Sequence, residues 1–179
     1  MKCFLADYSV DAPPVNHPLF DFEKKYLGSK PSEVFQTLTG WMASKSLGDK
    51  DLILQMDIEG AEYEVLLETS SDVLKRFRII VIELHDLDSL FDKMGFELLN
   101  QVFSKLLKDF EIVHIHPNNC RRSTTCYDYA IPPAMEFTFV RKDRLTHKSP
   151  ALDFPHPLDA KNMAQYADIT LPECWRHTN

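Results

Sequence analysis

The chain has 179 residues and a formal net charge of −7, with 44% hydrophobic and 26% charged residues. This length fits one domain with a sizeable core, and the composition is that of a globular protein. An acidic chain repels phosphate backbones, so nucleic acid is excluded as an expected partner. No apolar stretch can cross a bilayer and the first residues do not resemble a signal peptide, which predicts a cytoplasmic protein without a membrane partner.

The four cysteines, Cys3, Cys120, Cys126 and Cys174, lack the close spacing that is typical of zinc ligands. We therefore expect no cysteine metal site. In a cytosolic protein the thiols are expected to be reduced rather than paired in disulfides.

The first part of the chain predicts short elements separated by loops. Residues 2–6 form an apolar run that indicates a buried strand, and the prolines in 11–18 indicate a loop. Residues 19–27 are a candidate short helix. Residues 34–38 alternate weakly, as in a strand, and 39–47 are expected to form a helix capped by its first threonine.

The middle of the chain carries the strongest strand signals. Residues 52–56 are apolar apart from one glutamine, which is typical of a strand covered on both faces. After a turn at 57–60, residues 61–68 keep helical spacing, and Ser71 caps a further turn that reaches residue 77. Residues 79–84 begin with four β-branched residues in a row. We expect 52–56 and 79–84 to lie side by side at the centre of a sheet.

A long helix is predicted over 90–110, followed by strands at 112–115 and 137–140 with a long polar loop between them. Alternating strands and helices predict an α/β fold with a mostly parallel sheet and helices on both faces. The last two strands have no helix between them, so that pair can be antiparallel. We assign 1–145 to the domain and 146–179 to a tail that wraps it.

Polar side chains follow four of the predicted strands. In open α/β sheets, ligands bind beyond the carboxyl ends of the strands. The residues at these ends are Asp7, then Asp57 and Glu59, then Glu83, His85 and Asp86, and last His114, His116, Asn118 and Asn119. We predict that Asp7, Asp57, Glu59, His85 and His116 converge on one cleft.

Each of these residues also has a structural interpretation. Asp7 can cap a turn, and Asp57 and Glu59 can cap the helix that follows them. His85 can be a structural histidine as readily as a base.

Further along the chain, Glu83 lies in an apolar strand, so it needs a basic partner or belongs to the site. His114 and His116 are expected to point to opposite faces, with His116 toward the site, and Asn118 and Asn119 can be turn residues.

Several segments in order resemble the FkbM-type methyltransferases. The segment at 54–62 reads LQMDIEGAE and is similar to the MDIEGAE signature of that family. Further resemblances, in chain order, lie at 80–86 (IVIELHD), 113–119 (VHIHPNN), 136–141 (EFTFVR), 152–155 and 167–169.

The resemblance implies a Rossmann-like class I methyltransferase sheet, S-adenosyl-L-methionine as cofactor, and O-methylation of a hydroxyl on a small-molecule or glycan acceptor. It implies that Asp7 holds the ribose hydroxyls and that Asp57 also binds the cofactor. Asp57, Glu59, His85 and His116 are the implied catalytic residues. His85 or a carboxylate takes the proton, with no metal. The alternative is a divalent metal held by Asp57, Glu59 and His116.

The chain departs from the family pattern at its beginning. The family's first strand and glycine-rich loop should precede Asp7, where six residues stand, and the five glycines form no Gly-x-Gly-x-Gly pattern. We expect an N-terminally truncated sheet that binds the cofactor weakly or not at all. Two other hypotheses follow: an inactive remnant that serves as a binding or interaction module, and a metal-dependent hydrolase.

Overall fold

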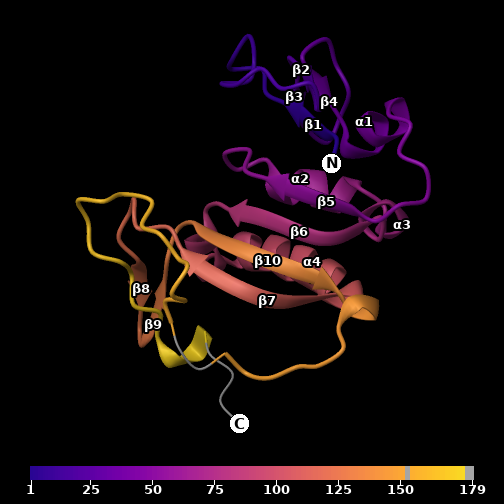
Figure 1. Cartoon of the computed structure of the whole chain (residues 1–179). Coiled ribbons are helices and arrows are strands. Elements are labelled where there is room, and N and C mark those ends of the chain that lie inside the picture. Colours follow the sequence, from indigo (N-terminus) through magenta and orange to yellow (C-terminus); the bar gives the residue numbers. More distant parts are fainter. Residues whose placement is uncertain (152–153, 176–179) are drawn as a thin grey trace.

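The structure, a computed structural model, describes residues 1–151 and 154–175. Its main layer is a four-stranded sheet with the strand order β5-β6-β10-β7 (Figure 1). These strands are β5 (Leu52–Met56), β6 (Phe77–Leu84), β10 (Met135–Arg141) and β7 (Phe110–Pro117). The fold is therefore mixed α/β, as the sequence predicts.

The sheet is mixed rather than mostly parallel, which corrects the prediction. β5 pairs with β6 in parallel, whereas β10 is antiparallel to both β6 and β7. The chain passes from β7 to β10 through a short hairpin, β8 (Thr124–Cys126) and β9 (Tyr129–Ile131), and not through a helix. Parallel strands are usually joined by a crossover helix, and this connection holds a hairpin instead, so the returning strand runs in the opposite direction.

The two strongest predicted strands do lie side by side, but only β6 is interior. β5 is at the edge of the four-stranded sheet, and its Ile53 side chain is 53% exposed. Leu54 and Met56 are buried, while Gln55 is exposed. The apolar run in β5 is thus a half-buried strand with one covered face, and its predicted central position is wrong.

One face of the sheet carries the core. The helices α2 (Glu62–Glu68) and α4 (Lys93–Asp109) contact each other and lie on this face. The short α3 (Ser71–Leu74) follows α2 in the chain and precedes β6. The Phe103 ring of α4 lies 5.5 Å from that of Phe137 in β10, and both rings pack edge to face. This layer buries most of the apolar surface that stabilises the fold.

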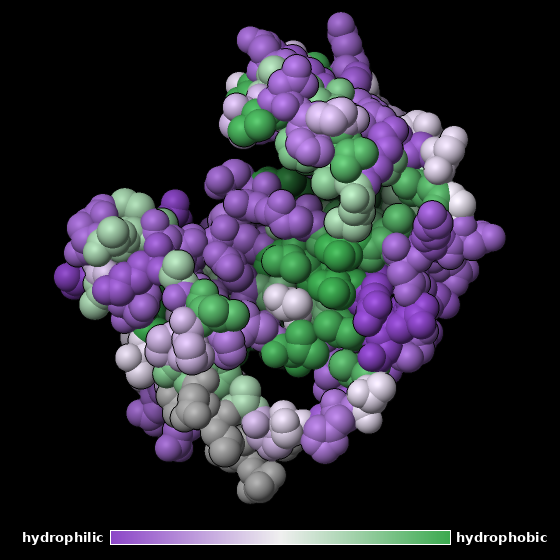
Figure 2. All heavy atoms as spheres, in the orientation of Figure 1, coloured by the Kyte–Doolittle hydropathy of each residue, from purple (hydrophilic) through white to green (hydrophobic). Residues whose placement is uncertain are grey.

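No helix covers the opposite face of the sheet among the described residues, so helices on both faces are not found. The side chains of β6 and β10 on this face, such as Val81 and Val140, are only partly buried. Figure 2 shows apolar side chains gathered on the exposed surface of the sheet. The four-stranded sheet is therefore single-sided.

The N-terminal region forms small sheets above β5 in Figure 1. β1 (Cys3–Ala6) pairs in parallel with β2 (Phe20–Glu23), and β3 (Tyr26–Leu27) with β4 (Phe35–Gln36). The predicted helix at 19–27 is wrong because Phe20-Asp21-Phe22-Glu23 alternates apolar and polar residues, the period of a strand.

Two helix starts differ from the prediction by a few residues. α1 (Leu38–Ser44) is capped by Thr37, whose hydroxyl accepts from the Gly40 N–H. After a 3-10 helix (Leu87–Phe91), α4 begins because the Asp92 carboxylate accepts from two backbone N–H groups. Gly95 does not interrupt α4. A Cβ there would lie 2.2 Å from the Ser89 carbonyl oxygen, so the close approach requires glycine.

The C-terminal tail follows a 3-10 turn (Lys142–Arg144), and a second such turn spans Glu173–Trp175. Leu171 is 3% exposed against the core. Among the described residues no helix is long and apolar enough to cross a membrane.

The described cysteines Cys3, Cys120 and Cys126 are free thiols. The side chain of Cys174 and the resemblance at 152–153 lie outside the described part of the chain. The division between domain and tail after residue 145 stays a prediction.

Candidate active site

A cavity of about 340 Å³ opens at the carboxyl ends of β5 and β6. It is lined by Asp57, Glu59, Glu83, His85, Asp86, Asn118, Cys120, Arg121, Pro133, Ala134 and Asn162. The volume suits a small-molecule ligand, and the position is the one where open α/β sheets bind ligands.

Parallel pairing brings the central acidic residues together. Met56 of β5 is in register with Ile82 of β6, so the next residues, Asp57 and Glu83, lie beside each other. His85 follows directly after β6. Ligand atoms of Asp57, Glu83 and His85 all lie within 4.8 Å of one another. Oxygen and imidazole ligands of this kind can hold a divalent cation.

Two turns at the cavity adopt unusual backbone conformations. Glu59 has φ 56° and Asp86 has φ 51°, and both are in the left-handed region. Such a conformation costs a non-glycine residue roughly 1–2 kcal/mol. Gly60, with φ 102°, completes the first turn, where an L side chain would be strained. Local strain of this kind gathers at functional sites and directs side chains into them.

His85 is held on one side and open on the other. Its Nδ1 atom lies 3.1 Å from Glu62 Oε1, and the Glu62 side chain is fully buried. Its Nε2 atom lies 3.9 Å from Asp57 Oδ1 and 3.7 Å from Glu59 Oε2. The Tyr63 hydroxyl donates to the His85 carbonyl oxygen. His85 therefore has a fixed ring with one nitrogen at the cavity.

The surroundings of Glu83 alter its ionisation. Burial raises the pKa of Glu83 above its usual range, and the charges of Asp57 and Glu136 add to the effect. The Asn118 amide donates to Glu83 Oε1 at 2.6 Å, and this hydrogen bond partly offsets the rise in pKa. Within 1–151 and 154–175, no Lys or Arg forms an ion pair with Glu83. The carboxylate thus belongs to the site.

The cavity is acidic overall because four carboxylates, Asp57, Glu59, Glu83 and Asp86, face one arginine, Arg121. Carboxylates attract cationic groups and accept hydrogen bonds from hydroxyls. The arrangement favours a cation or a polyhydroxyl ligand over an anion.

Three of the five residues predicted to converge do so: Asp57, Glu59 and His85 line the same cavity. Asp7 does not. It follows β1 directly, and its Oδ1 accepts from the Ser9 backbone N–H and hydroxyl, both at 2.7 Å. In this structure Asp7 has the geometry of a turn cap.

His116 lines a second, smaller cavity of about 50 Å³ that the C-terminal tail closes. It is 4% exposed, and its Nε2 atom has no hydrogen-bond partner among the residues that the structure describes. The metal alternative that combined His116 with Asp57 and Glu59 therefore lacks one ligand.

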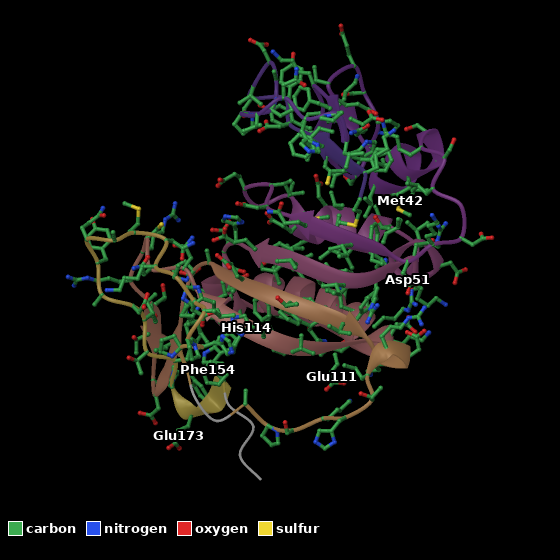
Figure 3. All side chains as sticks on the ribbon, in the orientation of Figure 1. Met42, Asp51, Glu111, His114, Phe154 and Glu173 are labelled. Atoms are coloured by element: carbon green, nitrogen blue, oxygen red, sulfur yellow. The ribbon has the colours of Figure 1, made fainter. Side chains whose placement is uncertain are left out.

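His114 and His116 share one face of β7, which corrects the prediction of opposite faces. They are in register with Thr138 and Glu136 of β10, and residues two apart on a strand point the same way. His114 Nε2 lies 2.8 Å from Asp159 Oδ1 of the tail. Figure 3 shows His114 on the side of the sheet where Phe154 and the tail lie.

The sequence reasoning missed the part of Glu62 and Tyr63 in holding His85. A signal was present: Glu62 is the third carboxylate within six residues, and it begins α2 directly after a glycine turn. The sequence does not indicate that Glu62 is buried, because glutamates in the first turn of a helix are usually exposed to solvent.

Comparison with protein families identifies one match. Residues 37–110 match the methyltransferase FkbM domain. The matched segment includes Asp57, Glu59, Glu62 and His85, and it does not reach Asp7 or His116. No curated protein and no solved structure gives a match to the chain. The resemblance found in the sequence is confirmed over this segment: residues 37–110 match the methyltransferase FkbM domain, which supports a methyltransferase enzyme.

Proposed function

We propose that the chain transfers a methyl group from S-adenosyl-L-methionine to a hydroxyl of a sugar or other small molecule bound in the 340 Å³ cavity. The observation that carries the proposal is the geometry of His85. Its Nδ1 is engaged by buried Glu62, and its Nε2 faces the carboxylates of Asp57 and Glu59.

The lining supports a neutral, hydroxyl-rich acceptor. Carboxylate and amide oxygens accept hydrogen bonds from hydroxyls, and Asn118 and Asn162 add amides beside the acids. An acceptor that carries phosphate or carboxylate groups would be repelled by the four carboxylates.

The same charges fit the methyl donor, which carries a sulfonium and an ammonium group. Asp57 would lie near these cationic groups. A sulfonium donor, when bound, supplies an electrophilic methyl group and leaves as a neutral thioether.

His85 is the proposed base. As the acceptor oxygen forms its new bond to carbon, its O–H bond breaks and the proton moves to His85 Nε2. Asp57 and Glu59 then stabilise the charged imidazole, since their oxygens lie 3.9 and 3.7 Å from that nitrogen. General base catalysis of this kind is worth about 10²- to 10⁴-fold in rate.

A cation-assisted reaction is the second candidate, and it is favoured by the ligand atoms of Asp57, Glu83 and His85 within 4.8 Å. A divalent cation at these atoms would lower the pKa of the acceptor hydroxyl. In that case His85 Nε2 would be a ligand and not the base.

The test is transfer of labelled methyl from S-adenosyl-L-methionine to a panel of neutral sugars, phosphorylated sugars and amines, with and without EDTA. We expect labelled neutral sugars or polyols and no effect of EDTA. Loss of activity with EDTA, restored by Mg²⁺ or Mn²⁺, would favour the cation. The absence of both transfer and cofactor binding at millimolar concentration would show an inactive remnant.

A further inference from the structure

We infer that Glu62 is a positioning residue for the methyl transfer, because it fixes the tautomer of His85. The inference rests on the proposed function in taking His85 as the base. It adds a residue that does not line the cavity and that acts on the reaction through the imidazole ring.

The backbone hydrogen bonds to Glu62 determine which partner donates in its contact with His85. Glu62 Oε1 accepts from the Ile58 N–H at 3.0 Å, and Oε2 accepts from the Gly60 N–H at 3.0 Å. A carboxylate with a backbone donor at each oxygen is an acceptor. The remaining contact, His85 Nδ1 at 3.1 Å from Oε1, therefore requires the hydrogen to be on Nδ1.

This direction leaves Nε2 of neutral His85 with a lone pair. Nε2 is the nitrogen on the side of Asp57 and Glu59, at the cavity. A base must present a lone pair to the proton that it takes, and the other tautomer would present an N–H there instead. Glu62 thus selects the tautomer that can react.

The support behind His85 is rigid. Glu62 is 0% exposed, and its carboxylate closes the turn 58–60 onto the first turn of α2. The next residue, Tyr63, donates its hydroxyl to the His85 carbonyl oxygen, so α2 holds both the ring and the backbone of His85. Burial also keeps water from competing for Nδ1, which strengthens the hydrogen bond.

Glu64 offers a matched comparison on the same helix. It also lies in the first turn of α2, but it is exposed and bonds Ser29 at 3.1 Å, far from the imidazole. Replacing either glutamate by glutamine removes one charge from the same turn, so a difference between the two variants reports the contact with His85.

The first test needs no variant. In the ¹⁵N-histidine-labelled wild-type protein, two-bond ¹H–¹⁵N spectra distinguish the two tautomers, and the His85 signals are those missing in His85→Gln. We expect the Nδ1–H form of neutral His85. A predominant Nε2–H form would overturn the inference, whether or not any variant folds.

The second test compares Glu62→Gln with Glu64→Gln and Glu62→Asp. Glutamine cannot accept at both positions, so its amide turns a donor toward Nδ1 or toward a backbone N–H. We expect a mixed or reversed tautomer and a kcat lowered roughly 10- to 100-fold with KM little changed, as for other residues that orient a histidine. Glu62→Asp, which keeps the acceptor, should restore the tautomer and part of kcat, and Glu64→Gln should leave both unchanged.

The outcomes separate the inference from the function on which it rests. An unchanged tautomer in folded Glu62→Gln overturns the inference. A changed tautomer together with full activity of His85→Gln overturns the proposed role of His85 instead.

Discussion

Two strands of the sheet, β6 and β7, are separated by β10, and each has a histidine near its carboxyl end that contacts a carboxylate. The two ends are nevertheless built differently. After β6, His85 contacts Glu62 from within the core, and its other nitrogen faces the 340 Å³ cavity. At β7, His114 contacts Asp159 of the C-terminal tail, and its neighbour His116 is enclosed in the cavity of about 50 Å³.

The difference shows what separates a reactive histidine from a structural one. Both arrangements have a carboxylate within hydrogen-bond distance of the histidine. That contact alone therefore does not distinguish a reactive histidine from a structural one. At β6 the acid is part of the domain core and the free nitrogen has room for a ligand. At β7 the acid comes from the segment that covers the histidines, so the same contact attaches the tail.

The largest expected effect is on catalysis. Replacing His85 with glutamine should lower kcat between about 10²- and 10⁴-fold, because the base is lost. Glutamine keeps a polar side chain of similar size, so the rest of the cavity should change little. His114→Gln should change kcat less than His85→Gln by at least an order of magnitude. Methyl transfer under saturating donor and acceptor measures both.

The comparison would break if the two variants were equally impaired while both remained folded by circular dichroism. It would be reversed if His114→Gln alone were inactive, since the β7 end would then carry the chemistry.

The second effect is on stability. Asp159→Asn should lower the free energy of unfolding by roughly 1–3 kcal/mol, because Asp159 accepts from His114 and from the His156 backbone N–H. Urea unfolding measures the change. Asp128→Asn, a charge change at an exposed position of the β8–β9 turn, is the control and should be neutral. A loss as large in the control would show a general charge effect.

The sequence predicted the parts of this arrangement that depend on local pattern. The run of β-branched residues after Arg78 and the MDIEGAE string located β6 and the turn after β5, and strand ends located Asp57, Glu59 and His85. The missed features depend on distant contacts. The insertion of β10 between β6 and β7, the tail over His116 and the burial of Glu62 have no local signal.

The smallest expected effect is the pH dependence of stability that Glu83 imposes. Burial raises the pKa of Glu83 above the ordinary 4.5, so the folded state holds this proton more tightly than the unfolded chain. As pH rises from 4.5 through the folded pKa, the folded state must ionise a group that resists ionisation, and stability falls. Below pH 4.5 the carboxyl is neutral in both states and the loss is absent.

Glu83→Gln should therefore stabilise the protein at pH 7 and leave it unchanged at pH 4, the opposite of Asp159→Asn. Glutamine keeps an oxygen to accept from Asn118, so the gain comes from removing the charge. Glu83 is only partly buried, and screening by solvent should keep the gain below about 1 kcal/mol. Thermal unfolding at the two pH values measures it, with the exposed Glu97→Gln as a control for net charge. In that case the charge of Glu83 destabilises the fold, whereas the charge of Asp159, which contacts His114 of β7, stabilises it. This contrast would indicate that Glu83 serves function rather than stability. A Glu83→Gln variant that is less stable at pH 7 would instead make Glu83 a structural group like Asp159.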